Sequence, residues 1–176
     1  MPAFTSRIDT NAESSAENRR EMLALVDRLH ALKDRTREAS ERRRAVFEER
    51  GQLTPRERIA RLLDPGMPFL ELFGMANYLV DTRDPEKSRP GANTIAGIGF
   101  VSGTRCMVYA SDSGINAGAS TPKSGEKLRA CLDIARDKKL PFLHLVESAG
   151  ANLLEYQVAG WAWGGGGFRR LAQLSA

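Results

Sequence analysis

The first part of the chain carries a single apolar stripe within a mostly charged pattern. Met22, Leu25, Val26, Leu29 and Leu32 recur at helical spacing, which places their side chains on one face of a helix. Beyond the last of these residues the stripe thins while the charged pattern continues. A helix with so narrow a stripe has little core of its own, so it is expected to pack on the following domain or on a partner subunit.

The boundaries of this amphipathic helix are predicted from its flanking residues. Ser14 and Glu17 have the spacing of a capping box, and Gly51 suits a helix end. The sequence therefore predicts a long amphipathic N-terminal helix over residues 14–51. The polar residues 1–13 before it are predicted to form a disordered tail.

A second helix is predicted directly after it. Thr54-Pro55-Arg56-Glu57 combines a capping threonine, proline at the first helical position and a glutamate that closes the box. Asp64-Pro65-Gly66 ends this helix. The apolar run Phe69–Leu72 then predicts a short strand.

The rest of the chain alternates extended and helical patterns. Two extended runs, 94–101 and 105–110, flank Ser102-Gly103-Thr104 and predict a hairpin. A helix over 122–138 and a short strand over 142–146 follow, and Gly164–Gly167 is expected to break the chain before a last helix. This order of elements is typical of an α/β fold with mixed strands.

Composition and charge exclude several classes of protein. The 176 residues are 41% hydrophobic and 27% charged, which is ordinary for a soluble globular protein. No apolar run approaches the roughly 18–20 residues of a membrane span, and the charged start lacks the apolar core of a secretion signal. The cytoplasm is therefore the predicted location. The net charge is +4, but residues 1–50 hold 11 basic and 10 acidic side chains, so no nucleic-acid partner is expected.

Side chains that usually carry catalysis are scarce. The chain has two histidines and two cysteines, so no metal site is expected. The segment Val146–Gly150 resembles a nucleophile elbow with Ser148 as nucleophile, but the triad would need a later histidine, and none follows His144 in the sequence. Alternatively, the backbone amides of Ala149 and Gly150 could hold a developing oxyanion. A tight turn that serves packing alone remains equally open.

Four stretches together resemble the carboxyltransferase (β) subunits of biotin-dependent acyl-CoA carboxylases, of the propionyl-CoA, methylcrotonoyl-CoA and geranyl-CoA type. They occur in the order that the family has, and they cover the chain from about residue 19 to its end. The stretches are Thr54–Ile59 with Leu62–Gly66, Gly97–Gly99 through Val101–Gly103, Gly125–Arg129, and Glu147–Leu153.

The resemblance implies a crotonase-like fold of ββα units, here incomplete, with residues 52–176 as the first part of the N-terminal carboxyltransferase domain. It implies transfer of a carboxyl group from carboxybiotin to the α- or γ-carbon of an acyl-CoA, with no metal bound by this chain. The implied partners are a biotin carboxylase/biotin carrier (α) subunit, which carries the biotin, and further β subunits in a homo-oligomer. Family members hold a second oxyanion hole in another domain, so the 176-residue chain alone is expected to be inactive. A non-catalytic assembly remnant is the alternative.

The resemblance also assigns candidate site residues. One oxyanion hole maps onto the amides of Ala149 and Gly150, where the family usually has two glycines, and Glu147 stands where aspartate is commoner. For CoA, the residue types at the start of the helix at 122 are suitable: free amides and a positive helix dipole favour an anion. Lys123, Lys127 and Arg129 add positive charge there and are expected to bind CoA, as is Ala151 at the end of the turn. A solvated basic helix end is the alternative. Asn152-Leu153 resembles the methylcrotonoyl or geranyl branch.

Overall fold

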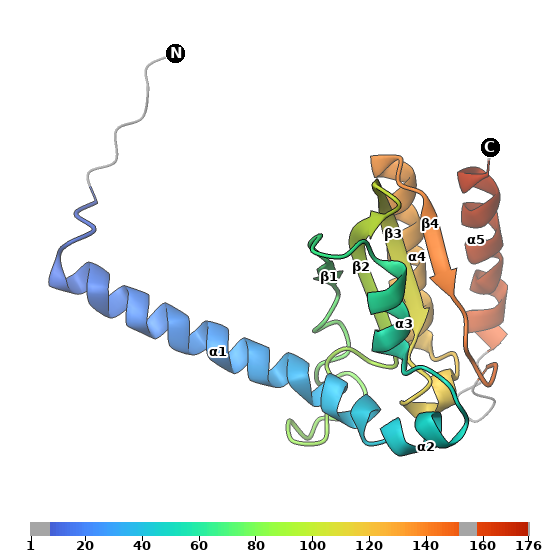
Figure 1. The fold of residues 1–176 in the computed structure, drawn as a ribbon, viewed down its shortest axis with the longest axis horizontal. Helices are drawn as coiled ribbons and strands as arrows, with labels where there is room; N and C mark the ends of the chain where they lie inside the picture. Colours follow the sequence, from blue (N-terminus) through green and yellow to red (C-terminus); the bar gives the residue numbers. More distant parts are fainter. Residues whose placement is uncertain (1–7, 152–157, 176) are drawn as a thin grey trace, which may run out of the picture.

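A mixed sheet forms the centre of the molecule (Figure 1). The computed structural model describes residues 8–151 and 158–175, with backbone alone for 158–165. Within this part of the chain the sheet has the order β1-β2-β3-β4, with β1 at Leu70–Leu72, β2 at Thr94–Val101, β3 at Thr104–Ser111 and β4 at Phe142–Leu145. The first three strands pair antiparallel and β4 pairs parallel with β3.

The predicted hairpin is confirmed, and a residue outside the hairpin holds its turn. Ser102 and Gly103 both have positive φ, 51° and 74°, as the twist of a two-residue hairpin turn requires. The carboxylate of Asp64 accepts from both of their amides at 2.7 Å. The residue predicted to end the second helix therefore also fixes the register of β2 and β3.

Helix α4 (Pro122–Lys138) packs on one face of the sheet and helix α3 (Pro55–Leu62) on the other. Side chains alternate between the two faces along a strand, so Met107 of β3 packs with Cys131 of α4 on one face. Val108 packs with Ile59 of α3 on the other. The bounds predicted for α4 are confirmed, and the succession β2-β3-α4 is the ββα unit expected from the family resemblance.

The predicted N-terminal helix is divided into two. Helix α1 spans Glu13–Glu41 and α2 spans Arg44–Glu49. The predicted long N-terminal helix is therefore confirmed, but it ends at Glu41, and its predicted continuation to residue 51 is wrong. The capping box is also wrong, because the helix has already begun at Glu13 and its N-cap, Ala12, makes no side-chain cap bond. After the break, Phe47 of α2 is buried, with 7% of its surface exposed.

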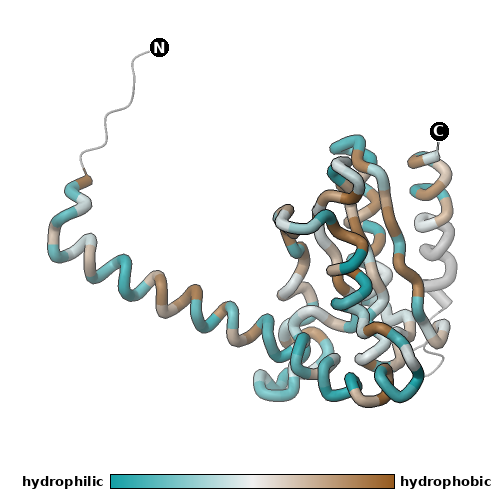
Figure 2. The backbone as a smooth tube through the Cα atoms, viewed as in Figure 1, coloured by the Kyte–Doolittle hydropathy of each residue, from teal (hydrophilic) through white to brown (hydrophobic). Residues whose placement is uncertain are grey.

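The apolar stripe of α1 faces solvent in this chain. Met22, Leu25 and Leu29 are 60%, 59% and 42% exposed, and Figure 2 shows hydrophobic positions in the middle of α1, where the helix projects from the body. The expected packing of the stripe on the following domain is therefore not observed. A partner subunit is the expectation that remains.

The carboxyl-terminal end of α1 is attached to the body. The Gly91 amide donates to Thr36 Oγ1 at 2.9 Å, and Ser40 Oγ donates to Asp112 Oδ1 at 2.6 Å. Gly114 allows this approach, because a Cβ there would lie 2.5 Å from Ser40 Oγ. The end of α1 thus rests on the loop that follows β3.

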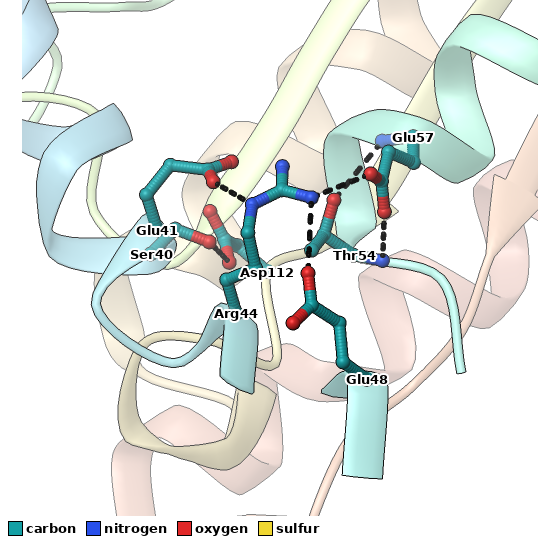
Figure 3. Close-up of polar contacts among 7 residues, drawn as sticks. All are labelled: Ser40, Glu41, Arg44, Glu48, Thr54, Glu57 and Asp112. Atoms are coloured by element: carbon teal, nitrogen blue, oxygen red, sulfur yellow. Dashed lines mark hydrogen bonds and ion pairs between the residues drawn. The ribbon is translucent and has the colours of Figure 1, made fainter. Parts of the chain in front are cut away.

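An arginine in α2 joins α1, α2 and α3 (Figure 3). Arg44 forms ion pairs with Glu41 and Glu57 at 2.7 Å and with Glu48 at 3.9 Å. The predicted capping box of α3 is present, with Thr54 and Glu57 bonded reciprocally. Hydrogen bonds from Arg44, and then from Thr54, lower the pKa of Glu57 to about 2.

The last helix runs through the glycines expected to interrupt it. Helix α5 spans Val158–Leu174, so the predicted break at Gly164–Gly167 is wrong. Packing on α4 outweighs the poor helix propensity of glycine, and Arg170 Nε donates to Asp133 of α4 at 2.8 Å. None of the helices in the described residues is both long and apolar enough to cross a membrane.

Candidate active site

The turn that follows β4 lies against the loop that follows β3. We refer to residues 147–151 as the site turn and to residues 112–121 as the facing loop. The Ala149 amide donates to Ala117 O at 3.0 Å, and the Ser120 amide donates to Gly150 O at 2.7 Å. Ser120 and Ala151 form an isolated parallel bridge. Backbone hydrogen bonds therefore hold the two segments together along the site turn.

The two amides expected to act as a pair have different roles in this geometry. Because the Ala149 amide already bonds to Ala117 O, it does not point at the same oxygen as its neighbour. Gly150 has a φ of 95°, a conformation that strongly favours glycine. Its amide donates to Ser148 Oγ at 3.1 Å, at an exposed position. Rotation of that serine side chain frees the Gly150 amide for another acceptor.

The facing loop stores backbone strain where it meets the site turn. Asn116, Ala117 and Gly118 have φ values of 48°, 49° and 67° in succession. Left-handed non-glycine residues cost of order 1–3 kcal/mol each and cluster at functional sites. At Gly118 an added Cβ would lie 2.2 Å from Glu147 O, so the close approach of the two segments requires glycine.

A cavity of about 410 Å³ opens beside the same loop. Asn93, 3% exposed, is part of its lining; its Nδ2 donates to Ala119 O at 2.6 Å, and its Oδ1 has no hydrogen-bond partner among the described residues. The lining also includes the start of α4, with Thr121, Pro122 and Lys123. The cavity therefore offers a buried acceptor and a lysine to a bound molecule.

The start of α4 has fewer free amides than expected. Thr121 and Ser124 form a capping box, which uses the Ser124 amide, and Pro122 has no amide to offer. The Lys123 ammonium pairs with Glu126, and its side chain is 24% exposed. Of the three basic residues proposed for CoA, Lys123 lines the cavity, whereas Lys127 and Arg129 do not.

Lys127, one of the residues expected to bind CoA, lies inside the protein. It is 3% exposed, and its ammonium donates to Gly91 O and Thr94 O, each at 2.8 Å. Burial lowers its pKa to about 8. Lys127 connects α4 to the segment 91–94, whose Gly91 amide donates to Thr36 of α1, so its charge serves the fold. Arg129 is half-buried on α4.

Lys127→Met is expected to lower the free energy of unfolding by about 1–3 kcal/mol, because two buried carbonyls lose their donor. Urea denaturation of the 176-residue chain measures this effect. The control is Lys138→Met at an exposed position of the same helix, which should leave the midpoint in place. Equal midpoints for the two variants would contradict a structural role for Lys127.

The fold defines a class of protein. The ββα unit of β2, β3 and α4, with β4 parallel to β3, agrees with the crotonase-like fold of carboxyltransferases. Residues 47–176 match the model of the carboxyl transferase domain, and the chain belongs to this family.

Individual relatives agree with this assignment. The chain is 42% identical over 127 residues to a probable biotin-dependent acyl-coenzyme A carboxylase beta2 subunit of Mycobacterium tuberculosis, covering 72% of this chain and 23% of that protein. It is 37% identical over 153 residues to a probable mitochondrial methylcrotonoyl-CoA carboxylase beta chain of Drosophila melanogaster, covering 84% and 25%. The crystal structure of the P. aeruginosa geranyl-CoA carboxylase beta subunit matches with a TM-score of 0.86 and 42% identity, over 99% of this chain and 32% of that one. The chain thus spans about a quarter of the length of these curated relatives.

The family assignment disfavours the serine hydrolase alternative, and so does the geometry. Ser148 Oγ accepts from the Gly150 amide. His144 packs edge-on against Tyr109, with ring centroids 5.0 Å apart. The small residues between Gly114 and Gly118 predict a loop, but nothing in the sequence indicated that this loop lies against the site turn.

Proposed function

We propose that this chain provides one half of a carboxyltransferase site, which moves a carboxyl group from carboxybiotin to the α- or γ-carbon of an acyl-CoA. The observation that carries the proposal is the site turn: a glycine with a φ of 95° presents its amide at an exposed position, beside the loop that also borders the cavity. Membership of the carboxyl transferase family supports the same reaction.

In this proposal the Gly150 amide holds a reacting carbonyl oxygen as that oxygen becomes negatively charged. A fixed donor stabilises the negative charge on this oxygen far more than water does, because the donor does not have to reorient during the reaction. The Ala149 amide acts differently, because its bond to Ala117 O fixes the turn on the facing loop. Biotin on a partner subunit supplies the carboxyl group, and the exposed turn leaves room for its approach.

The proposed partners follow from the resemblance to beta subunits of biotin-dependent carboxylases. A biotin carboxylase/biotin carrier (α) subunit brings the biotin, and the remainder of a β subunit brings the second oxyanion hole. Further β subunits complete the site in a homo-oligomer. The cytoplasmic location remains a prediction.

A chimera tests the proposed function. Residues 1–176 replace the matching part of the P. aeruginosa geranyl-CoA carboxylase beta subunit, which is assembled with its biotin-bearing partner. Biotin-dependent carboxylation is measured with geranyl-, methylcrotonoyl- and propionyl-CoA. Turnover of at least one of them is expected from the chimera and none from the 176-residue chain alone. A folded, assembled chimera without turnover would contradict the proposed function, and turnover by the isolated chain would contradict the shared site.

We further propose that the cavity holds part of the CoA moiety, with the Lys123 ammonium near a phosphate. Lys123→Ala is expected to weaken CoA binding to the chimera by about tenfold, the effect of losing one charge-assisted contact of about 1.5 kcal/mol. Isothermal titration with CoA measures the dissociation constant. Lys138→Ala, at an exposed position far along α4, is the control, and an unchanged constant in Lys123→Ala would remove Lys123 from the CoA site.

The exposed stripe of α1 is proposed to pack on another subunit. Leu25→Lys with Leu29→Lys is expected to lower the sedimentation coefficient of the assembled chimera, since burial of each leucine is worth roughly 1.5–3 kcal/mol. The melting temperature of the isolated chain should stay in place, because both side chains are exposed there. Unchanged sedimentation would show that the stripe is not an interface.

A further inference from the structure

A polar cluster connects helix α3 to the site turn. Arg58 Nη2 forms an ion pair with Glu147 Oε2 and donates to Ser113 Oγ at 3.4 Å. Ser113 Oγ donates in turn to Glu147 Oε2 at 2.7 Å. We call these three residues the Arg58 cluster. It joins α3, the facing loop and the site turn, which are far apart in the sequence.

The cluster is shielded enough to hold a fixed geometry. The side chains of Arg58 and Glu147 are 27% and 31% exposed, so water competes for them less than at an open surface. Asp112, 1% exposed, lies close enough to add a second negative charge near the guanidinium. Burial lowers the pKa of Arg58 while this aspartate opposes the change.

Helix α3, which carries Arg58, is held in place by polar contacts and by packing. Its first turn is fixed by the capping box of Thr54 and Glu57 and by the ion pair of Glu57 with Arg44, as Figure 3 shows. Ile59, the next residue after Arg58, is 4% exposed and packs on the sheet. The guanidinium therefore extends from a backbone that is fixed on both sides.

The backbone and the side chain of the site turn are held by different partners. The facing loop fixes the backbone: it bonds to Ala149 N and Gly150 O, and Gly118 closely approaches Glu147 O. The side chain of Glu147, the first residue of the turn, is held by the Arg58 cluster. Loss of that link would let the start of the turn shift relative to the sheet, three residues before the Gly150 amide.

We propose that Arg58 is a positioning residue of the carboxyltransferase site: it holds Glu147 so that the Gly150 amide keeps its direction. This inference rests on the proposed function, because it needs the Gly150 amide to face a reacting oxygen. Arg58 itself touches no substrate and acts through Glu147.

Turnover of the chimera described above gives the first test. Arg58→Ala and Glu147→Gln are each expected to lower kcat by about tenfold to a hundredfold, since a displacement of about 1 Å can cost that much. KM for the acyl-CoA should change by less than about threefold, because the interaction lost is one made in the transition state. The double variant should be no slower than either single variant, since the two residues act as one unit. Arg58→Lys should recover part of the loss, because its ammonium can still pair with Glu147.

The same helix supplies a matched control. Arg56 forms an ion pair with Glu71 at 3.0 Å, with side-chain exposures of 23% and 26%, and this pair lines a separate cavity with residues of α1, none of them in the site turn. Arg56→Ala should lower the melting temperature about as much as Arg58→Ala while leaving kcat near that of the parent. Equal kcat losses in the two variants would make Arg58 merely structural and overturn the proposal.

Amide hydrogen exchange gives a readout that does not depend on turnover. In the assembled subunit, peptides that contain residues 147–151 should exchange about tenfold faster in Arg58→Ala and Glu147→Gln than in the parent, as local opening becomes easier. Arg56→Ala should leave their exchange unchanged. If the parent chimera lacks turnover, the proposed function fails while exchange still tests the link. Equal exchange of this segment in the Arg58→Ala and Arg56→Ala variants would overturn the positioning role.

Discussion

Replacement of the Gly150 amide by an ester is expected to lower kcat of the chimera by about 10²–10³-fold, the cost of losing one donor to a developing oxyanion. The change is made by incorporating glycolic acid at position 150, which exchanges the N–H for an oxygen and keeps the backbone path. A proline substitution would also delete the amide, but proline locks φ near −65°, and Gly150 has a φ of 95°. The ester therefore isolates the hydrogen bond from the shape of the turn.

Gly66 is the matched control for the ester. It has a φ of 77° at an exposed position, and an added Cβ at Gly66 or at Gly150 would meet nothing within 4 Å. Glycolic acid at position 66 should leave kcat unchanged, because Gly66 lies in the turn after α3, outside the site turn and the facing loop. Parental turnover of a folded ester variant at position 150 would remove Gly150 from the oxyanion hole.

Those parts of the fold that depend on local signals could be predicted from the sequence. The capping box at Thr54, the hairpin at Ser102-Gly103 and the apolar stripe of α4 each act within a few residues. Local signals failed where a distant contact decides the outcome. The break after Glu41 depends on the bridge of Arg44 to Glu57 and on the burial of Phe47, and α5 continues through its glycines because it packs on α4.

The same distinction between local signals and distant contacts applies to the candidate site. The turn at Ala149-Gly150 could be found because small residues follow an apolar strand, but the use of each amide could not. The partner of the Ala149 amide is Ala117, which lies 32 residues earlier in the chain, and no periodicity links the two. Lys127 was assigned to the site from a local signal, because it lies near the basic start of a helix and could bind a phosphate. In the structure its ammonium instead donates to Gly91 O and to Thr94 O of the sheet.

Among substitutions that add a single methyl group to the site, Gly118→Ala is expected to be the most disruptive. The new Cβ would lie 2.2 Å from Glu147 O, a backbone atom that cannot rotate away, and φ is 67° at this position. Overpacking of this kind typically costs about 1–3 kcal/mol beyond the strain of a left-handed alanine. To relieve the contact, the site turn must move away from the facing loop, which carries the Gly150 amide out of position. We expect a loss of about a hundredfold in kcat from a shift of about 1 Å.

Gly51→Ala separates this clash from backbone strain. Gly51 has a φ of 62°, close to that of Gly118, but an added Cβ there meets nothing within 4 Å. Both variants therefore bear similar strain in the left-handed conformation, and only Gly118→Ala pushes on the site turn. Urea denaturation should show a larger loss of stability for Gly118→Ala, and kcat of the chimera should fall in that variant alone. If the two variants lose equal stability and keep equal turnover, close contact between the facing loop and Glu147 is not what holds the site turn in place.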